Sequence, residues 1–307
     1  MKRNLLIVAA LAAFCVGAFA QAKPYGWPPP PSRLTLPVWP GTPPGEPAHM
    51  PPEHNVPNGH LVAGRPYIRL TDVSRPTLTL YKAEGKNSGA AFLVFPGGGY
   101  SIVAMNLEGT EICRWLNSIG VNCVLLKYRV PNSGPYPKSD EALQDAQRAM
   151  GLVRLHAAAW GIDPNRLGVM GFSAGGNLVV QISNHYQKRL YAPLDAADKL
   201  SCRPDFAVAI YPAYLVQPKH GYALNPVDRP TPNTPPTFLL QAENDPVHVE
   251  NVIKYFLALK NAGVPAELHI YAKGGHGYGL RHTGLPISHW PALVQTWLHT
   301  IKVLPGQ

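Results

Sequence analysis

The chain has 307 residues, of which 46% are hydrophobic and 15% charged, and this suffices for one large hydrophobic core. Its formal charge of +9 comes from basic residues scattered without a run or a recognition motif, which argues against a nucleic-acid-binding protein. The four cysteines include no Cys-x-x-Cys pair, so a structural zinc site is not indicated and we expect no metal.

The N-terminus has the pattern of an export signal. Lys2 and Arg3 precede an uncharged apolar run that starts at Leu5 and ends in Ala18-Phe19-Ala20, a small-x-small cleavage pattern. The run is short for a bilayer span, so an uncleaved anchor is the less favoured alternative, and no later segment is long and apolar enough to cross. We predict a signal peptide over residues 1–20, a secreted or periplasmic protein, and no membrane contact after cleavage.

A proline-rich segment follows over residues 21–65. It holds thirteen prolines between residues 21 and 57, and such a segment forms neither a helix nor a central strand. We predict an extended arm that is either loose or draped over the domain. Trp27 and Trp39 favour draping, because free tails seldom carry large aromatic side chains.

The remaining residues, 66–307, predict one α/β catalytic domain. Strands are predicted at 67–73, 77–83, 90–95, 122–129, 166–171, 206–211, 237–241 and 267–272, the first two being antiparallel. Helices are predicted at 107–118, 140–159, 174–186, 248–261 and 287–303. This alternation predicts a mostly parallel sheet with an antiparallel N-terminal edge and helices on both faces. The irregular segment 213–236 is predicted to form a small lid above the carboxyl ends of the strands.

Residues 169–178 read VMGFSAGGNL at a predicted strand-to-helix turn. Gly171-x-Ser173-x-Gly175 in this setting is the pattern of a nucleophile elbow. The tight turn should strain the backbone of Ser173, and β-carbons at the two glycines would collide with neighbouring elements. Because Ser173 lies at a helix N-terminus, where N–H groups favour developing negative charge, we predict a nucleophile rather than an inert turn serine.

A serine nucleophile needs a histidine base and an acid that orients it, in the chain order Ser, acid, His. The loop after 237–241 reads AENDPV, where Asp245 is preferred over Glu243 because Asp-Pro commonly opens the turn into a helix. The loop after the last strand reads KGGHGYG, and the flanking glycines let the ring of His276 approach Ser173. We therefore predict a Ser173–His276–Asp245 triad.

The loop after strand 90–95 reads PGGGY. Its glycines can bring N–H groups to a substrate carbonyl, so Gly98 and Gly99 are predicted to form an oxyanion hole with the N–H of Ala174. A phosphate cradle is the alternative, but the Gly-x-x-x-x-Gly-Lys-Ser/Thr pattern is absent. Tyr100 and His248 are further candidates for substrate contacts, although a solvated helix start explains His248 equally well.

Three cysteines remain after the predicted cleavage, so at least one has no partner within the chain. Cys113 lies in a predicted helix and Cys123 in the strand after it, which makes a bridge conceivable. Buried free thiols are the simpler alternative.

Taken together, these segments resemble the α/β-hydrolase esterases, and within them the bacterial acetyl-xylan-esterase-like group. The resemblance covers nearly the whole mature chain. Its matching text is PGGGY (96–100), LEGTEICRWLNSIGVNCVLLKYRVP (107–131), LQDAQRAMGLVRLHAAAWGIDPNRLGVMGFSAGGNL (143–178), NDPVHVEN (244–251) and GGHGYGL (274–280). It implies catalysis by Ser173, Asp245 and His276 without metal or cofactor, on acyl esters of sugars such as acetylated xylan. Family members commonly carry His where Asn177 stands; this position is a turn into the helix, so we expect the departure not to affect the triad.

Three functions follow from this reading. The first is a serine carboxylesterase that removes short acyl groups, above all acetyl, from plant-type carbohydrate through an acyl-enzyme. The second is a prolyl-oligopeptidase-like peptidase, disfavoured because a propeller domain and an anchor for a peptide amino terminus are absent. The third is a non-catalytic glycan-binding protein with the same cleft, against which the intact Ser–Asp–His set argues.

Overall fold

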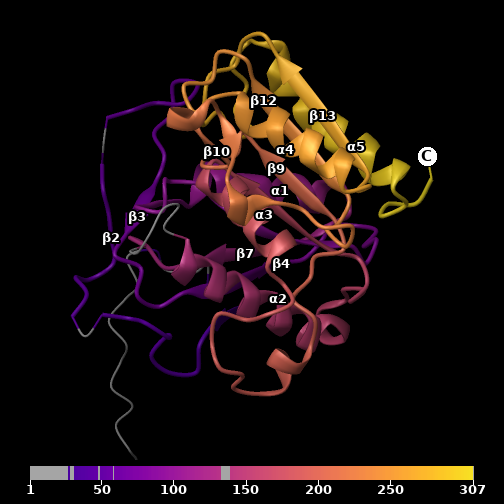
Figure 1. Cartoon of the computed structure of the whole chain (residues 1–307). Coiled ribbons are helices and arrows are strands. Elements are labelled where there is room, and N and C mark those ends of the chain that lie inside the picture. Colours follow the sequence, from indigo (N-terminus) through magenta and orange to yellow (C-terminus); the bar gives the residue numbers. More distant parts are fainter. Residues whose placement is uncertain (1–26, 28–30, 48, 58, 133–138, 307) are drawn as a thin grey trace, which may run out of the picture.

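An eight-stranded sheet runs through the centre of the computed structural model, which describes Trp27 and residues 31–47, 49–57, 59–132 and 139–306 (Figure 1). The predicted signal peptide lies outside these residues. In spatial order the strands are β1 (Thr35–Pro37), β4 (Thr77–Tyr81), β7 (Asn122–Lys127), β5 (Ala91–Phe95), β8 (Leu167–Phe172), β9 (Ala207–Ile210), β12 (Thr237–Ala242) and β13 (Ala266–Tyr271). The strands from β7 to β13 are parallel, and β1 and β4 run antiparallel at one edge. The predicted fold class is confirmed.

Helices cover both faces of the sheet. They are α1 (Glu111–Ser118), α2 (Asp140–Trp160), α3 (Ala174–Asn184), α4 (Glu250–Asn261) and α5 (Trp290–Thr300). From β5 the chain crosses by α1 to one side, and from β8 by α3 to the other, so right-handed crossovers place α1 and α3 on opposite faces. Trp115 of α1 contacts Trp290 of α5, with ring centroids 5.4 Å apart, whereas α2 packs on α3. All residues of β5, β7, β8 and β12 are buried, as expected between two helical layers.

The proline-rich arm supplies the edge strand of the sheet. β1 pairs with β4 and ends at Pro37, a position that proline tolerates because the outer side of an edge strand needs no donor. Trp39 is buried, and its Nε1 donates a hydrogen bond to Oδ1 of Asp145 at 2.7 Å. Of the two arrangements predicted for the arm, the draped one is therefore present in its described part.

The strands predicted at 67–73 and 77–83 both form but are not each other's partners. β3 (Arg69–Thr71) pairs with β2 (His54–Asn55) and β6 (Val103–Ala104) in a separate small sheet, while β4 lies between β1 and β7. Asp72 between them has a left-handed backbone, with φ of 53°, which redirects the chain. The arm strand β1 then takes the free edge of β4.

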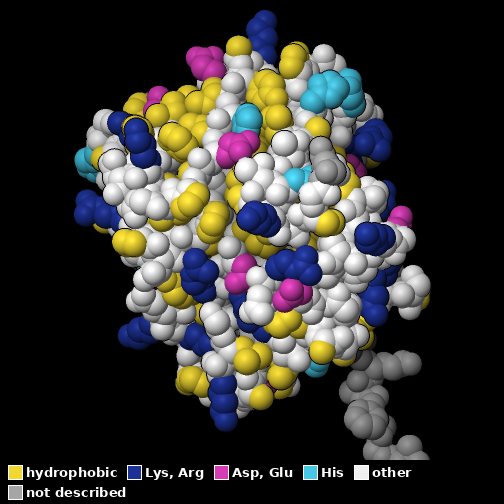
Figure 2. Space-filling view, turned by 90° about the vertical axis from the view of Figure 1, so that its right-hand side faces the viewer, with side chains coloured by type: hydrophobic (Ala, Val, Ile, Leu, Met, Phe, Trp, Pro, Cys, Tyr) yellow, Lys and Arg dark blue, Asp and Glu magenta, His cyan; other side chains and the backbone are white. Residues whose placement is uncertain are grey.

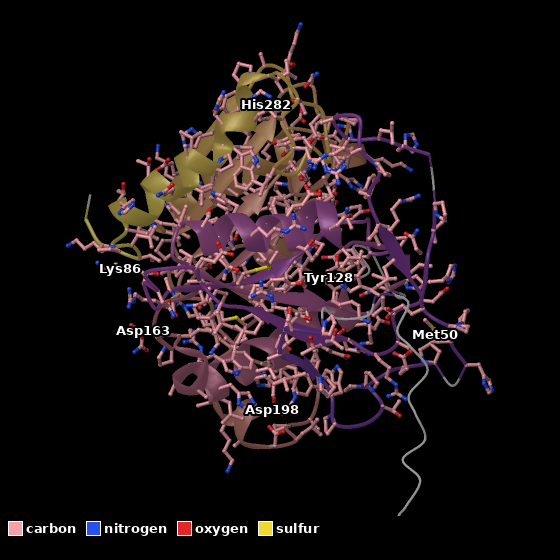
Figure 3. The ribbon with its side chains drawn as sticks, turned by 180° about the vertical axis from the view of Figure 1, so that it is seen from behind. Met50, Lys86, Tyr128, Asp163, Asp198 and His282 are labelled. Atoms are coloured by element: carbon pink, nitrogen blue, oxygen red, sulfur yellow. A yellow bond between two sulfur atoms is a disulfide. The ribbon has the colours of Figure 1, made fainter. Side chains whose placement is uncertain are left out.

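A disulfide joins Cys113 of α1 to Cys123 of β7, with Cα atoms 5.2 Å apart (yellow in Figure 3). The alternative of free thiols at these two positions is therefore wrong. Cys202 is free and buried. The bridge attaches α1 to β7, which lies next to β5 in the sheet. The PGGGY loop follows β5.

The basic side chains are distributed over the face of the molecule shown in Figure 2. Figure 2 shows Lys and Arg spread over one face rather than gathered in a patch, in agreement with their scatter along the sequence. Among the described residues, no helix combines the length and apolar character that a bilayer span requires.

Candidate active site

The sheet topology brings two distant loops together. The chain leaves β5 toward β7 and leaves β8 toward β9, so the order of strands reverses between β5 and β8. Ligands of such sheets bind at the carboxyl ends of the strands that flank this reversal. The PGGGY loop follows β5 and Ser173 follows β8, so both lie at that point.

Ser173 occupies a strained turn between β8 and α3. Its φ of 54° and ψ of −118° lie outside the regions that non-glycine residues ordinarily adopt. A β-carbon on Gly171 would lie 2.0 Å from the carbonyl oxygen of Gly175, and one on Gly175 would lie 2.0 Å from that of Phe95. Both glycines are therefore required by close approach, as the elbow pattern predicts.

Ser173, His276 and Asp245 form one hydrogen-bonded chain. Oγ of Ser173 lies 2.7 Å from Nε2 of His276, and Nδ1 of His276 lies 2.9 Å from Oδ2 of Asp245. Asp245 is buried, and its carboxylate also accepts hydrogen bonds from Nε2 of Gln241 at 3.1 Å and the N–H of Val247 at 2.7 Å. Since an ionised carboxylate only accepts, Nδ1 carries the proton and Nε2 is left to accept from the serine.

The glycine loop presents donors beside the serine. The N–H groups of Gly98 and Gly99 donate no hydrogen bond within the described part of the chain, whereas that of Gly97 donates to Oε2 of Glu108 at 2.7 Å. A β-carbon on Gly97 would lie 2.9 Å from Cβ of Ser173, so the loop runs directly against the serine. Ala174 opens α3, where the first N–H groups have no partner within the helix.

The other predicted residues differ in position. Glu243, the alternative acid, is exposed, so Asp245 is the carboxylate that reaches His276. Tyr100 is buried, and its hydroxyl donates to Oδ1 of Asn177 at 2.7 Å, so it lies behind the site. His248 lines a cavity that also reaches Ser173.

Two cavities adjoin Ser173. One, of about 400 Å³, lies under the lid and is lined by Ser173, Ala213, Tyr214, Val216, Pro218, Pro246, Val247, His248 and Asn251. The other, of about 220 Å³, lies against the glycine loop and is lined by Tyr67, Gly98, Gly99, Ile102, Ala104, Leu107, Glu108, Ser173, His276 and Gly277. The lid itself contains the paired strands β10 (Val216–Gln217) and β11 (Ala223–Leu224). Within the described residues, no three His, Cys, Asp or Glu side chains converge to hold a metal ion.

Glu108 and Tyr211 were not predicted as site residues from the sequence. Glu108 is buried in a short π-helical turn, η1 (Asn106–Thr110), and its Oε1 accepts from the hydroxyl of Tyr211 at 2.8 Å. Burial raises the pKa of Glu108, and the hydrogen bonds from Tyr211 and Gly97 counteract that shift. One signal was available: Glu108 lies four residues before Ile112, on the apolar face of the predicted helix.

The family follows from comparison with known proteins. A family with the alpha/beta hydrolase fold matches residues 92–222, which include the glycine loop and the elbow. The acetyl ester-xyloside bifunctional hydrolase of Caldicellulosiruptor lactoaceticus is 33% identical, and its crystal structure aligns with a TM-score of 0.69 over 92% of this chain and 98% of that chain. This chain belongs to the α/β-hydrolase family.

Curated relatives extend the comparison. An acetylxylan esterase of Xylanibacter ruminicola is 29% identical over 265 residues, which cover 78% of this chain and 50% of that protein. An ethyl acetate hydrolase of Pseudomonas putida is 30% identical over 215 residues, which cover 62% of this chain and 66% of that protein. The chain thus spans about half the length of the acetylxylan esterase. The names of all three relatives refer to esters of acetic acid.

Proposed function

We propose that the protein is a serine carboxylesterase that hydrolyses acetyl and other short acyl esters, with plant-type carbohydrate such as xylan as the substrate class. The observation that carries the proposal is the hydrogen-bonded chain from Ser173 through His276 to Asp245, placed beside a glycine loop with uncommitted N–H groups. The acetyl group and the carbohydrate rest on the names of the relatives.

Acylation uses the chain of hydrogen bonds directly. Oγ of Ser173 attacks the ester carbonyl carbon while Nε2 of His276 takes the hydroxyl proton, and Asp245 stabilises the imidazolium that forms. The carbonyl oxygen becomes an oxyanion, which accepts hydrogen bonds from Gly98 or Gly99 and from Ala174. Loss of one such donor typically costs about 3 kcal/mol of transition-state stabilisation.

Release of the alcohol and deacylation complete the cycle. The imidazolium of His276 protonates the leaving alkoxide, which leaves the acyl group on Ser173. His276 then takes a proton from water, whose oxygen attacks the acyl carbon. When the second tetrahedral intermediate collapses, Ser173 recovers its proton and the carboxylic acid leaves. No step needs a cofactor.

Hydrolysis of 4-nitrophenyl acetate tests the proposal. We expect turnover by the wild type and a loss of about 10⁴-fold or more in Ser173→Ala, with Ser118→Ala, at the exposed end of α1, as the control that keeps full activity. Faster cleavage of peptide amides than of esters would favour a peptidase. A folded protein that binds xylan without releasing acetate would favour a glycan-binding role. Acetate release from acetylated xylan and oligosaccharides tests the substrate class.

Export to an oxidising compartment is part of the proposal. The Cys113–Cys123 disulfide supports it, because such bonds persist in the periplasm or outside the cell and are rare in the cytosol. Cell fractionation with N-terminal sequencing should find a mature protein that begins near Gln21. A chain that retains Met1 in the cytosolic fraction would contradict it.

A further inference from the structure

A buried carboxylate connects three of the loops that build the site. Glu108 is 3% exposed, and Oε2 accepts from the N–H of Gly97 in the loop after β5. Oε1 accepts from the hydroxyl of Tyr211, which directly follows β9. The hydroxyl oxygen of Tyr211 in turn accepts from the N–H of Gly279 at 3.1 Å, in the loop that carries His276.

The contact with Gly97 determines which N–H groups the substrate can use. The carboxylate occupies the N–H of Gly97, so the next two, those of Gly98 and Gly99, are the ones left for an oxyanion. The space is tight, because a β-carbon on Gly97 would lie 2.7 Å from Oε2 of Glu108 and 2.6 Å from the carbonyl oxygen of Phe172. A shift of the carboxylate would therefore shift the loop against the elbow.

The hydrogen bond between Glu108 and Tyr211 connects the carboxylate to the loop that carries His276. The ring of Tyr211 meets that of His276 edge-on, with centroids 5.0 Å apart, and its hydroxyl holds Gly279, three residues further along the same loop. Both oxygens of Glu108 accept hydrogen bonds, so the residue is not free to act as a second base although it lines the smaller cavity. Its hydrogen bonds with Gly97 and Tyr211 hold segments that carry the oxyanion-hole N–H groups and contact His276.

We propose that Glu108 is a positioning residue, which sets the N–H groups of Gly98 and Gly99 relative to Ser173 and His276. The inference rests on the proposed esterase function. A charge buried this deeply is costly unless its hydrogen bonds are complete, and here they come from the backbone and side chain of the catalytic loops. Breaking them should reduce transition-state stabilisation more than substrate binding.

The test compares Glu108→Ala and Glu108→Gln with Tyr211→Phe. In Glu108→Ala we expect kcat for 4-nitrophenyl acetate to fall by about 10²–10³-fold, the cost of one oxyanion donor, with KM within about threefold of the wild type. Glu108→Gln keeps an acceptor for Gly97 and should stay within about tenfold of the wild type. Tyr211→Phe cuts only the link toward His276 and should fall between the two.

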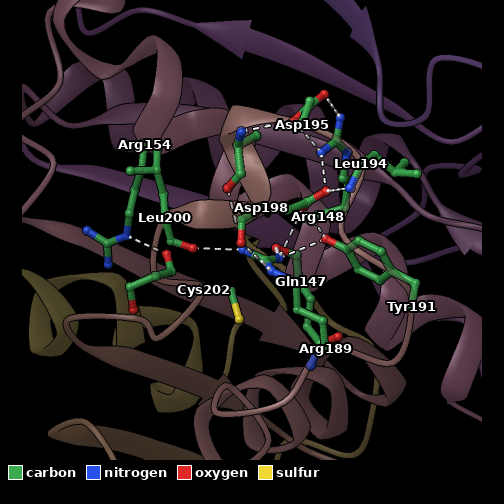
Figure 4. Close-up of polar contacts among 12 residues, drawn as sticks. Gln147, Arg148, Arg154, Arg189, Tyr191, Leu194, Asp195, Asp198, Leu200 and Cys202 are labelled. Atoms are coloured by element: carbon green, nitrogen blue, oxygen red, sulfur yellow. Dashed lines mark hydrogen bonds and ion pairs between the residues drawn. The ribbon is translucent and has the colours of Figure 1, made fainter.

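A transition-state analogue separates positioning from general damage. A trifluoromethyl ketone forms a tetrahedral adduct with the serine, so its inhibition constant should rise by the same factor by which kcat/KM falls across the Glu108 variants. The matched control is Asp198→Asn, because Asp198 is also a buried carboxylate but accepts from Arg148 and Tyr191, both at 2.7 Å, in a cluster that adjoins α2 (Figure 4). This variant should lose thermal stability and keep the wild-type kcat.

The possible results are distinct. The positioning role would be overturned if Glu108→Ala folds and keeps the wild-type kcat and inhibition constant. It would also be overturned if kcat falls while the inhibition constant is unchanged. Either result leaves the esterase proposal intact. If Glu108→Ala does not fold, the same two measurements on Tyr211→Phe decide, and wild-type values there would equally overturn it. A wild type that hydrolyses no ester would remove both proposals together.

Discussion

Replacement of Gly175 by alanine tests whether activity depends on the close contact beneath the elbow. The new β-carbon would lie 2.0 Å from the carbonyl oxygen of Phe95 and 2.8 Å from that of Pro96. Real β-carbons essentially never approach an atom closer than 3.0 Å, so the end of β5 or the start of α3 must move by about 1 Å. Both segments carry groups of the proposed oxyanion hole.

The expected effect has two parts. Overpacking of this kind typically lowers the free energy of unfolding by about 1–3 kcal/mol, which the better helix propensity of alanine offsets by up to about 1 kcal/mol. A displacement of about 1 Å at reacting groups costs about 10²-fold in rate. We therefore expect Gly175→Ala to fold, with kcat/KM for 4-nitrophenyl acetate reduced about 10²-fold.

The matched control is Gly151→Ala in the middle of α2. There the β-carbon would lie 2.4 Å from the carbonyl oxygen of Ala197, a comparable clash that involves neither the elbow nor the glycine loop. Urea unfolding should show similar destabilisation of the two variants, while only Gly175→Ala loses activity in its folded form. Full activity in Gly175→Ala, or an equal loss in Gly151→Ala, would show that activity does not depend on the close contact beneath the elbow.

Three further perturbations follow. Asp245→Asn keeps the shape of the side chain but cannot hold the same tautomer of His276. We expect kcat to fall by about 10⁴-fold with KM little changed. A loss below tenfold would argue against Asp245 as the acid of the triad. Burial raises the pKa of Asp228 to about 8, so the folded protein retains a proton that the unfolded chain releases near pH 4. The resulting stability is complete below about pH 4, decreases as the pH rises from there, and is lost above about pH 8. Calorimetry should show Tm falling between about pH 5 and 8 in the wild type and less in Asp228→Asn, and equal slopes would contradict this. Removal of the bridge in a Cys113→Ser, Cys123→Ser double variant should cost about 3 kcal/mol in urea unfolding, because the bond closes a loop with a sequence separation of 10 and so reduces the entropy of the unfolded chain. Reducing agent should leave that variant unchanged.

The convergence of Ser173, Asp245 and His276 could be predicted because each residue follows a strand of a parallel sheet. Carboxyl ends of parallel strands meet at one edge, so loop order and strand order together place such residues near one another. The need for glycine at position 171 has a local cause, since the contacts that exclude a β-carbon there come from its own strand–turn–helix unit. At Gly175 the excluding contacts come from Phe95 and Pro96 at the end of β5, which only the folded sheet brings close.

The role of Glu108 could not be predicted in the same way. Its partners are Gly97 and Tyr211, and only the folded sheet brings the turn that follows β9 next to the turn that precedes α1. A carboxylate near the start of a helix has a local explanation in the helix dipole. The place of Glu108 on the apolar face of the predicted helix indicates burial, but it does not identify the hydrogen-bond partners.

Local patterns in the sequence determined the elements, the elbow and the order of the loops, because these depend on the contacts of each residue with neighbours a few positions away. Three features depend on the tertiary structure and could not be read from local patterns. They are the pairing of β4 with the arm strand β1 instead of β3, the bridge between Cys113 and Cys123, and the partners of Glu108. Each of these is a choice among partners distant in sequence, and it depends on which groups the packed core brings within contact distance.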